Sequence, residues 1–162
     1  MYKIAVLLAT YNGSEYLKEL LKSLEDQKMV SMKIFAIDDD STDNTLDILK
    51  KTKIPIKIFK SKKYKNPTKN FIYLIQNVPM NFDYYCFCDQ DDVWKKNKLD
   101  YSIKKIKAFK AEVLGSRTFY TDKKLNVWGK SILFKKKLSL NNSLVQSICG
   151  GNTQIWTKKF QK

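Results

Sequence analysis

The sequence predicts an α/β fold in which helices flank a mostly parallel central sheet. Apolar runs of strand length alternate with segments whose apolar residues recur at helical spacing. The first apolar run, residues 3–9, is continuous, as in strands that are buried on both faces. The 162 residues fit one domain with a real core, and they contain no repeat, low-complexity linker or composition boundary. We therefore expect one domain over residues 1–162.

The first half of the chain has three strand-and-helix pairs. Strands are expected at residues 3–9, 33–37 and 56–59. A helix follows each strand, and the apolar positions of the three helices are Tyr16, Leu17, Leu20, Leu21 and Leu24, then Leu46, Ile48 and Leu49, then Phe71, Leu74 and Ile75. Ser14 is placed to cap the first of these helices.

The second half begins in the same way and then changes. A strand is expected at 84–88 and a lysine-rich helix at about 95–109. After that the pattern turns to β, with extended chain over 112–121, a hairpin turn near 122–126 and a strand at 131–134. Helices from the crossovers between parallel strands then cover both faces of the sheet.

Polar residues gather where three of the expected strands end. The clusters are Thr10–Gly13, Asp38–Asp43 and Asp89–Asp92. In open α/β sheets, ligands bind outside the carboxyl ends of the strands. A binding site, if the chain has one, is expected where these clusters meet.

The two acidic clusters allow both a structural and a chemical interpretation. The aspartates at 38–40 suit a loop before a helix that Ser41 or Thr42 caps, because acids favour a helix N-terminus. The Asp89–Asp92 carboxylates could hold Mg²⁺ or Mn²⁺, and the ion would neutralise a diphosphate leaving group. Alternatively, Asp92 caps the following helix, although capping needs only one aspartate.

Several classes of site are disfavoured or excluded. Neither a Walker phosphate loop nor the Gly-rich dinucleotide fingerprint occurs. The sequence has no histidine, which excludes Ser-His-Asp and Cys-His nucleophiles. Cys86 and Cys88 would share one face of a strand without a second ligand pair, so buried structural thiols are expected rather than zinc ligands.

The formal charge of +15 is unevenly distributed. Every acidic residue lies at or before Asp122, and nine lysines lie between Lys123 and Lys162. This pattern allows a solvated lysine-rich surface or attraction to anionic lipid. Nucleic acid is a weaker candidate because Arg117 is the only arginine. No apolar run long enough for a membrane span and no signal-peptide pattern is found. We expect a cytoplasmic protein, with peripheral association at the inner face of the cell membrane as an option.

Five segments in order carry a resemblance to family 2 glycosyltransferases of the GT-A fold, especially the bacterial rhamnosyltransferase-like and polysaccharide-synthesis members. The segments are Val6–Gly13, Ile37–Asp43, Cys88–Trp94 with Lys98-Leu99 following, Phe119–Asp122 and Cys149–Thr153. The second resembles the Asp-Asp-Gly-Ser-x-Asp loop of the family, with Asp40 in place of glycine. The third is similar to the metal-binding D-x-D motif.

The resemblance implies roles for individual residues. The donor would be a UDP- or dTDP-sugar with Mn²⁺ or Mg²⁺, and the acceptor a saccharide or lipid-linked saccharide. Trp94 would pack under the metal loop. The implied nucleotide-binding residues are Thr10 and Tyr11 at base and ribose, their neighbour Asn12, Asp38 at the pyrimidine N3–H, Lys69 facing the nucleotide and Asp89 near the ribose, with Asp91 as the metal ligand.

One departure from the family pattern concerns catalysis. An inverting transferase needs a general base for the acceptor hydroxyl, and in the family an Asp or Glu follows the Gly-containing segment. This chain has no acid after Asp122 and no histidine. We therefore expect a GT-A fold truncated at its C-terminus, with an incomplete acceptor region and no identified catalytic base. Three hypotheses stay open: a glycosyltransferase, a nucleotide-sugar-binding remnant without turnover, and a basic protein that binds anionic membrane or nucleic acid.

Overall fold

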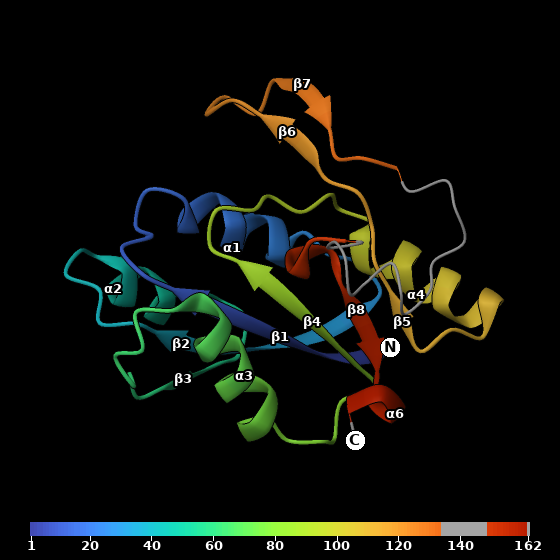
Figure 1. The fold of residues 1–162 in the computed structure, drawn as a ribbon, viewed down its shortest axis with the longest axis horizontal. Coiled ribbons are helices and arrows are strands. Elements are labelled where there is room, and N and C mark those ends of the chain that lie inside the picture. The colour runs from blue at the N-terminus through green and yellow to red at the C-terminus, as the bar shows by residue number, and fades with distance from the viewer. Residues whose placement is uncertain (134–148, 162) are drawn as a thin grey trace.

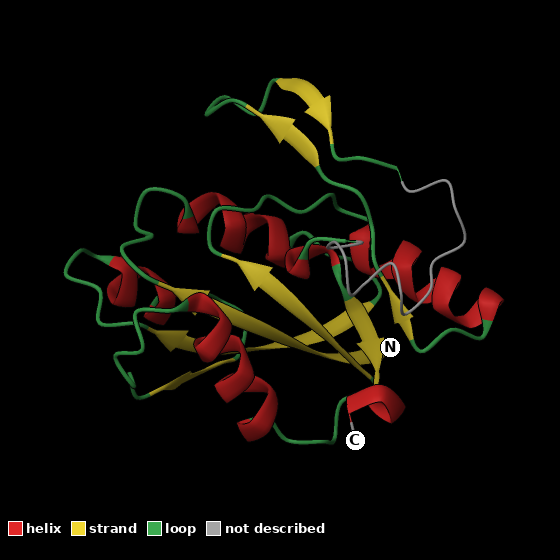
Figure 2. Ribbon diagram, in the orientation of Figure 1, coloured by secondary structure: helices red, strands yellow, loops and turns green. Residues whose placement is uncertain are grey.

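The structure is a computed structural model that describes residues 1–133 and 149–161, and a six-stranded sheet lies at its centre (Figures 1 and 2). The strand order is β3-β2-β1-β4-β8-β5. The first four strands in this order are parallel, and β8 pairs antiparallel with both β4 and β5. The strands are β1 Tyr2–Thr10, β2 Val30–Asp38, β3 Ile56–Phe59, β4 Tyr84–Asp89, β5 Val113–Leu114 and β8 Ile155–Thr157. The predicted α/β architecture is confirmed.

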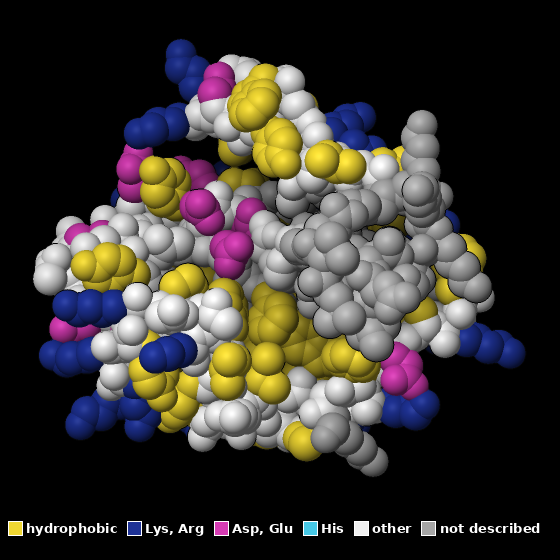
Figure 3. Space-filling model, in the orientation of Figure 1, with side chains coloured by type: hydrophobic (Ala, Val, Ile, Leu, Met, Phe, Trp, Pro, Cys, Tyr) yellow, Lys and Arg dark blue, Asp and Glu magenta, His cyan; other side chains and the backbone are white. Residues whose placement is uncertain are grey.

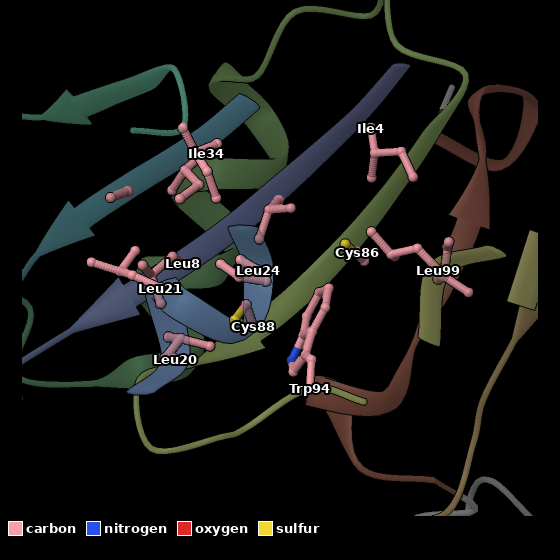
Figure 4. Packing of buried hydrophobic residues seen from close by; sticks show 14 of the residues in the cluster. Ile4, Leu8, Leu20, Leu21, Leu24, Ile34, Cys86, Cys88, Trp94 and Leu99 are labelled. Carbon is pink, nitrogen blue, oxygen red and sulfur yellow. The ribbon is translucent and has the colours of Figure 1, made fainter. Parts of the chain in front are cut away.

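Successive residues of β1 alternate between two apolar clusters, one on each face of the sheet. Both faces are therefore apolar, and helices pack on each. Ile4, Val6 and Leu8 belong to the cluster that includes residues of α1, α2 and α4, part of which Figure 4 shows. Ala5 and Leu7 belong to the cluster that includes Leu74 of α3 and Trp156 of β8. The helices are α1 Leu17–Glu25, α2 Thr45–Lys50, α3 Pro67–Asn77, α4 Lys98–Phe109 and the short α6 Lys158–Gln161, with a 3-10 turn, η1, at Gly151–Thr153.

The two cysteines of β4 lie in the first of these clusters, as expected for structural thiols. Cys86 and Cys88 are buried on the same face of the strand. Burial raises the pKa of the Cys86 thiol to about 12 and that of Cys88 well above its ordinary value. Neither thiol is therefore available as a thiolate at neutral pH.

The predicted Ser14 cap is wrong, and neither alternative cap, Ser41 or Thr42 before α2 and Asp92 before α4, is observed. Helix α1 follows Tyr16 without a side-chain cap, and the Gly13 carbonyl accepts the first N–H groups. Helix α2 follows Asn44, and the Asp43 carboxylate accepts from Thr45 N–H. Helix α4 follows Asn97 and not the Asp92 region. The polar side chains near these helices instead make contacts between loops: Ser41 Oγ accepts from Asn12 N–H, and Asp92 accepts from Asn152 Nδ2. Such contacts compete with local capping.

The β region after α4 is divided between two sheets. The predicted extended segment 112–121 forms β5 in the main sheet and β6, Phe119–Thr121, outside it. β6 pairs antiparallel with β7, Val127–Lys130, and the turn at 122–126 agrees with the prediction. The strand predicted at 131–134 is not found at residues 131–133, and residue 134 lies outside the described residues. β8 was not predicted, because its three residues are too few to show a period.

Candidate functional site

The three polar clusters lie together at the carboxyl edge of the sheet. β1 is the neighbour of both β2 and β4, and its end pairs with theirs: Thr10 lies opposite Asp38, and Ala9 lies opposite Asp89. Parallel pairing of adjacent strands therefore brings the segments after all three strands to one place, as predicted.

A cavity of about 500 Å³ opens at this edge. Thr10 at the end of β1 and Tyr11 directly after it line the cavity. Asp39 lines it from the β2 loop, Asp89 from the end of β4 and Asp91 from the loop that follows. The N-terminal end of α3 and the loop before it form the opposite wall, with Lys65, Asn66, Pro67, Asn70 and Phe71. Four of the seven predicted site residues, Thr10, Tyr11, Asp89 and Asp91, thus border the cavity, whereas Asn12, Asp38 and Lys69 do not.

Asp38 is a structural residue of the β2 loop. Its side chain is buried, and the Thr10 hydroxyl donates to Oδ1 at 2.8 Å. Ser41 donates twice, from its hydroxyl to Oδ1 at 2.6 Å and from its backbone N–H to Oδ2 at 2.9 Å. Both carboxylate oxygens therefore have partners within the protein, and the carboxylate stabilises the turn that follows β2.

Asp39 is the acid of this loop that lines the cavity. The residue is 4% exposed, and Oδ2 accepts from Asn66 N–H at 3.2 Å. Its Oδ1 is buried and has no hydrogen-bond partner among the described residues. A buried acceptor without a partner is costly, and one beside a cavity is suited to a ligand N–H. The family resemblance implied Asp38. The structure distinguishes the two neighbours by the three contacts that occupy Asp38, by the unpartnered Oδ1 of Asp39 and by the place of Asp39 in the cavity wall.

Asn12 and Lys69 lie beside the site without lining the cavity. Asn12 joins two loops: its N–H donates to Ser41 Oγ at 2.8 Å, and its Oδ1 accepts from Thr42 N–H at 2.9 Å. Lys69 is exposed in the first turn of α3, where its N–H donates to Asn66 Oδ1. Lys65, two residues before the start of α3 at Pro67, instead provides a lysine in the cavity wall.

Gln90 ties the β4 loop to the β1 loop. Its Oε1 accepts from Tyr11 N–H at 2.8 Å, and its Nε2 donates to Tyr11 O at 3.0 Å. Gly13 is needed beside this contact, because a Cβ there would lie 2.4 Å from Gln90 Oε1. Gln90 thereby holds the Tyr11 backbone next to Asp89 and Asp91, the two residues that flank Gln90 in the sequence.

The β4 loop holds its carboxylates in an unfavourable environment. Asp89 and Asp91 accept no side-chain hydrogen bond from the described residues. Burial, together with the charges of Asp92 and Asp91, raises the pKa of Asp89 to about 6. Burial also raises the pKa of Asp92. Two hydrogen bonds from Asn152 Nδ2, at 2.7 and 2.9 Å, act in the opposite direction and lower this pKa. The loop is thus one that a bound cation would stabilise.

A second cavity, of about 420 Å³, lies between α4, hairpin β6–β7 and η1, and Asp91 borders both cavities. Lys98 in its wall donates to Asn152 O at 2.9 Å and lies 3.6 Å from the Trp94 ring centre. Burial lowers the pKa of this lysine. Trp94 is buried in the core below the loop, as expected for a packing role.

The donor set at the first cavity fits Mg²⁺ or Mn²⁺ in its chemistry. Asp89 and Asp91 offer only carboxylate oxygens, and both ions take oxygen ligands and leave positions for water and phosphate. Among residues 1–133 and 149–161, no group of three or more His, Cys, Asp or Glu side chains is arranged as a complete metal site. Asp91 would therefore hold a metal together with the ligand, rather than in a cage made by the protein.

The parallel sheet and the acidic loops at its carboxyl edge define the GT-A class of nucleotide-sugar transferase folds. The family model for glycosyl transferase family 2 matches residues 5–161, and the chain belongs to this family. The match spans both acidic loops and the segment that contains β8.

Relatives and solved structures agree with this assignment. The chain is 45% identical over 102 residues to the dTDP-rhamnosyl transferase RfbG of Shigella flexneri, an alignment that covers 59% of this chain and 35% of RfbG. The structure of Staphylococcus aureus TarS 1–349 in complex with UDP-GlcNAc matches 96% of this chain and 45% of that chain, with a TM-score of 0.75 and 25% identity. The mannosyltransferase PcManGT from Pyrobaculum calidifontis, in complex with GDP-Man and Mn²⁺, shares the fold with a TM-score of 0.67, 10% identity, and coverage of 96% and 44%. The chain thus spans less than half the length of these relatives.

Proposed function

We propose that the chain binds the UDP- or dTDP-sugar donor of a glycosyltransferase, together with Mn²⁺ or Mg²⁺, in the synthesis of cell-surface polysaccharide or lipopolysaccharide. The observation that carries the proposal is the buried Oδ1 of Asp39, which lacks a partner among the described residues and borders the 500 Å³ cavity. Asp89 and Asp91 border the same cavity from the next loop. One space therefore offers an acceptor for a base and carboxylates for a metal.

The Asp39 end of the cavity suits a pyrimidine that carries an N3–H. Uracil and thymine both donate at N3, and a carboxylate oxygen accepts such a bond well. Tyr11 is half exposed at the cavity wall, so its ring can pack on the base while Thr10 lies beside the ribose. Asp39 would make the base contact in place of Asp38, because both carboxylate oxygens of Asp38 already accept hydrogen bonds from Thr10 and Ser41.

The β4 loop suits the ribose and diphosphate. Asp89 would accept from a ribose hydroxyl, and Asp91 would bind the cation. The cation, when bound, supplies charge neutralisation for the leaving diphosphate. Two similar proteins support this donor class: RfbG is a dTDP-rhamnosyl transferase, and TarS was solved with UDP and with UDP-GlcNAc. Lys65 would add a positive charge near the phosphates, whereas Lys69 would act only at longer range.

The acceptor would be a saccharide or a lipid-linked saccharide, and transfer would proceed with inversion. The inverting step needs a general base for the acceptor hydroxyl. Asp122 is the last acid of the sequence, and its carboxylate accepts from Lys124 N–H, Asn126 N–H and Asn126 Nδ2 in the hairpin turn. These bonds lower its pKa, which weakens it as a base. They favour a second candidate function, a nucleotide-sugar-binding module without transferase turnover.

Calorimetric titration of UDP and dTDP, with and without Mn²⁺, tests the proposal. We expect binding that requires the metal, survives Asp40→Ala and is lost in Asp91→Ala. Asp40 is the matched control because it lies in the neighbouring acidic loop, is exposed and forms a surface ion pair with Lys63. No binding under any metal condition would contradict donor binding and would favour a protein whose acidic loops are only structural.

Turnover then separates the two candidate functions. We expect slow donor hydrolysis at most, and little transfer to an added acceptor, from the 162-residue chain. Robust transfer would show that a general base is present and that the binding-module candidate is wrong.

A further inference from the structure

Hairpin β6–β7 exposes an unusual concentration of apolar side chains. Residues 119–133 contain seven of the 19 exposed large hydrophobic residues in the described part of the chain. Trp128 is 73% exposed and Ile132 is 76% exposed. The hairpin forms a two-stranded sheet of its own, apart from the central sheet. Figure 3 shows these hydrophobic side chains gathered over the hairpin, with basic side chains at its edges.

The two sides of the hairpin have different surroundings. Phe119, Thr121 and Val127 border the second cavity, where Lys95 Nζ lies 4.0 Å from the Phe119 ring centre. Tyr120 and Trp128 do not border that cavity, and their rings stack on each other with centroids 5.2 Å apart. Because both rings are exposed, this stacked pair forms an apolar surface that no described part of the chain covers.

The charge around this surface is positive. Residues 117–133 include four basic residues, Arg117, Lys123, Lys124 and Lys130, and one acid, Asp122. The Asp122 carboxylate is engaged by its own turn. Within the described residues, the only ion pair of these four cations joins Lys123 to Glu15. Arg117 donates to Ser131 O, and Lys130 Nζ lies 5.0 Å from the Phe119 ring centre. Neither contact neutralises the charge, which is therefore available to an external anion.

We propose that hairpin β6–β7 docks on an anionic lipid surface, with Tyr120 and Trp128 in the interface and Lys124 and Lys130 at the headgroups. Tyr and Trp favour the membrane interface because their rings are amphipathic. Lysines near an anionic bilayer add attraction, and exposed aliphatic residues such as Ile132 gain from the acyl boundary. Nucleic acid offers no comparable partner for aliphatic side chains, and a second copy of the hairpin would bring like charges together.

Docking by this surface would also orient the donor cavity. In Figure 3, the hydrophobic side chains of the hairpin and the acidic side chains at the carboxyl edge of the sheet are visible on the same face of the molecule. A membrane at the hairpin would then lie beside the opening of the site. The inference goes beyond the proposed function and does not depend on it, since lipid binding can be measured without donor or turnover.

The tryptophans provide a built-in test. Of the three in the sequence, Trp94 and Trp156 are buried, and Trp128 alone is exposed. Phosphatidylcholine vesicles with a phosphatidylglycerol fraction should shift the emission to the blue and protect it from acrylamide. Pure phosphatidylcholine vesicles should do so much less. Trp128→Phe should remove the spectral change while co-sedimentation with the vesicles persists.

Matched variants separate the hairpin from general basicity. Tyr120→Ala with Trp128→Ala should lower the partition coefficient by about tenfold or more, whereas Phe109→Ala on α4, also an exposed aromatic, should change it by less than about twofold. Lys124→Glu with Lys130→Glu should weaken binding more than Lys50→Glu with Lys53→Glu, which changes the total charge equally. All these side chains are exposed, so the variants should retain the fold, as circular dichroism would verify.

Three results would overturn the inference. The first is no co-sedimentation with anionic vesicles. The second is co-sedimentation with unchanged Trp128 emission, which would indicate adsorption through lysines elsewhere. The third is an equal blue shift with single-stranded RNA, which would indicate a nucleic-acid surface instead.

Discussion

The two acidic loops at the edge of the sheet look alike in sequence and differ in chemistry. In the loop after β2, the carboxylates of Asp38 and Asp43 accept several short hydrogen bonds from nearby hydroxyl and N–H groups. These bonds lower the pKa of Asp43, with the Thr45 hydroxyl the largest cause. In the loop after β4, Asp89 and Asp91 accept no such bonds from described residues, and the pKa of Asp89 is raised.

The partners of a carboxylate, rather than its neighbours in sequence, therefore indicate its role. Carboxylates whose oxygens all accept hydrogen bonds within the protein stabilise a loop. Carboxylates beside a cavity that have an oxygen without a hydrogen-bond donor are suited to bind a ligand. Asp39 is the exception within the β2 loop, since one of its oxygens is used by Asn66 and the other has no described partner.

Asp38→Ala should reduce the free energy of unfolding by about 3 kcal/mol, because it removes a buried carboxylate and leaves the Thr10 hydroxyl and Ser41 N–H without their acceptor. Urea denaturation followed by circular dichroism measures this loss. Asp38→Asn keeps one acceptor and should lose clearly less. A loss below about 0.5 kcal/mol for the alanine variant would show that Asp38 is not structural.

Gly13→Ala should cost about 1–2 kcal/mol of unfolding free energy. The new methyl group would lie 2.4 Å from Gln90 Oε1 and would displace the side chain that makes two hydrogen bonds to Tyr11. The control is the double variant: once Gln90→Ala has removed the obstacle, adding Gly13→Ala should cost little. Equal costs in both backgrounds would mean that Gln90 does not join the loops.

Asp89→Asn should stabilise the protein without ligand by about 1 kcal/mol at about pH 7, a value reduced for solvent screening of a half-buried group. The folded pKa, about 6, is above the ordinary value of 3.8, so ionisation of Asp89 opposes folding. This cost is absent below 3.8, grows between the two values and is complete above 6. The stabilisation should therefore fade in denaturation experiments toward about pH 4. A destabilised variant at neutral pH would place Asp89 with the structural carboxylates.

Asp40→Asn should change the unfolding free energy by less than about 0.5 kcal/mol. Asp40 has a φ of 69°, a conformation that asparagine adopts readily, and its ion pair with Lys63 is exposed. Thermal denaturation beside the wild type measures this. A large loss would mean that the exposed acid of the loop also holds it together.

Much of the fold and of the site location was predictable, because buried parallel strands and the polar clusters at their ends leave direct signals in sequence. The continuous apolar run at residues 3–9 identified β1, and adjacency of strand ends brought Asp89 near Thr10. The helix caps, β8 and the choice between Asp38 and Asp39 were not predictable. The caps and the choice between the two aspartates depend in part on contacts 28 or more residues apart, such as Thr10 with Asp38 and Ser14 with Asp43, for which local pattern carries no signal. β8 has only three residues, too few to show a period. For Lys69 and Asn12, contact with the nucleotide stays a prediction.

We propose that Asp39 reads the base of a bound pyrimidine nucleoside diphosphate. The most direct test is calorimetric titration of UDP and CDP, with Mn²⁺ present, into the wild type, Asp39→Asn and the matched control Asp40→Asn. Cytosine accepts at N3 where uracil donates, so the carboxamide should shift preference from UDP toward CDP by about tenfold or more. Asp40→Asn should behave as the wild type. Unchanged selectivity in Asp39→Asn, with UDP still bound, would contradict the account.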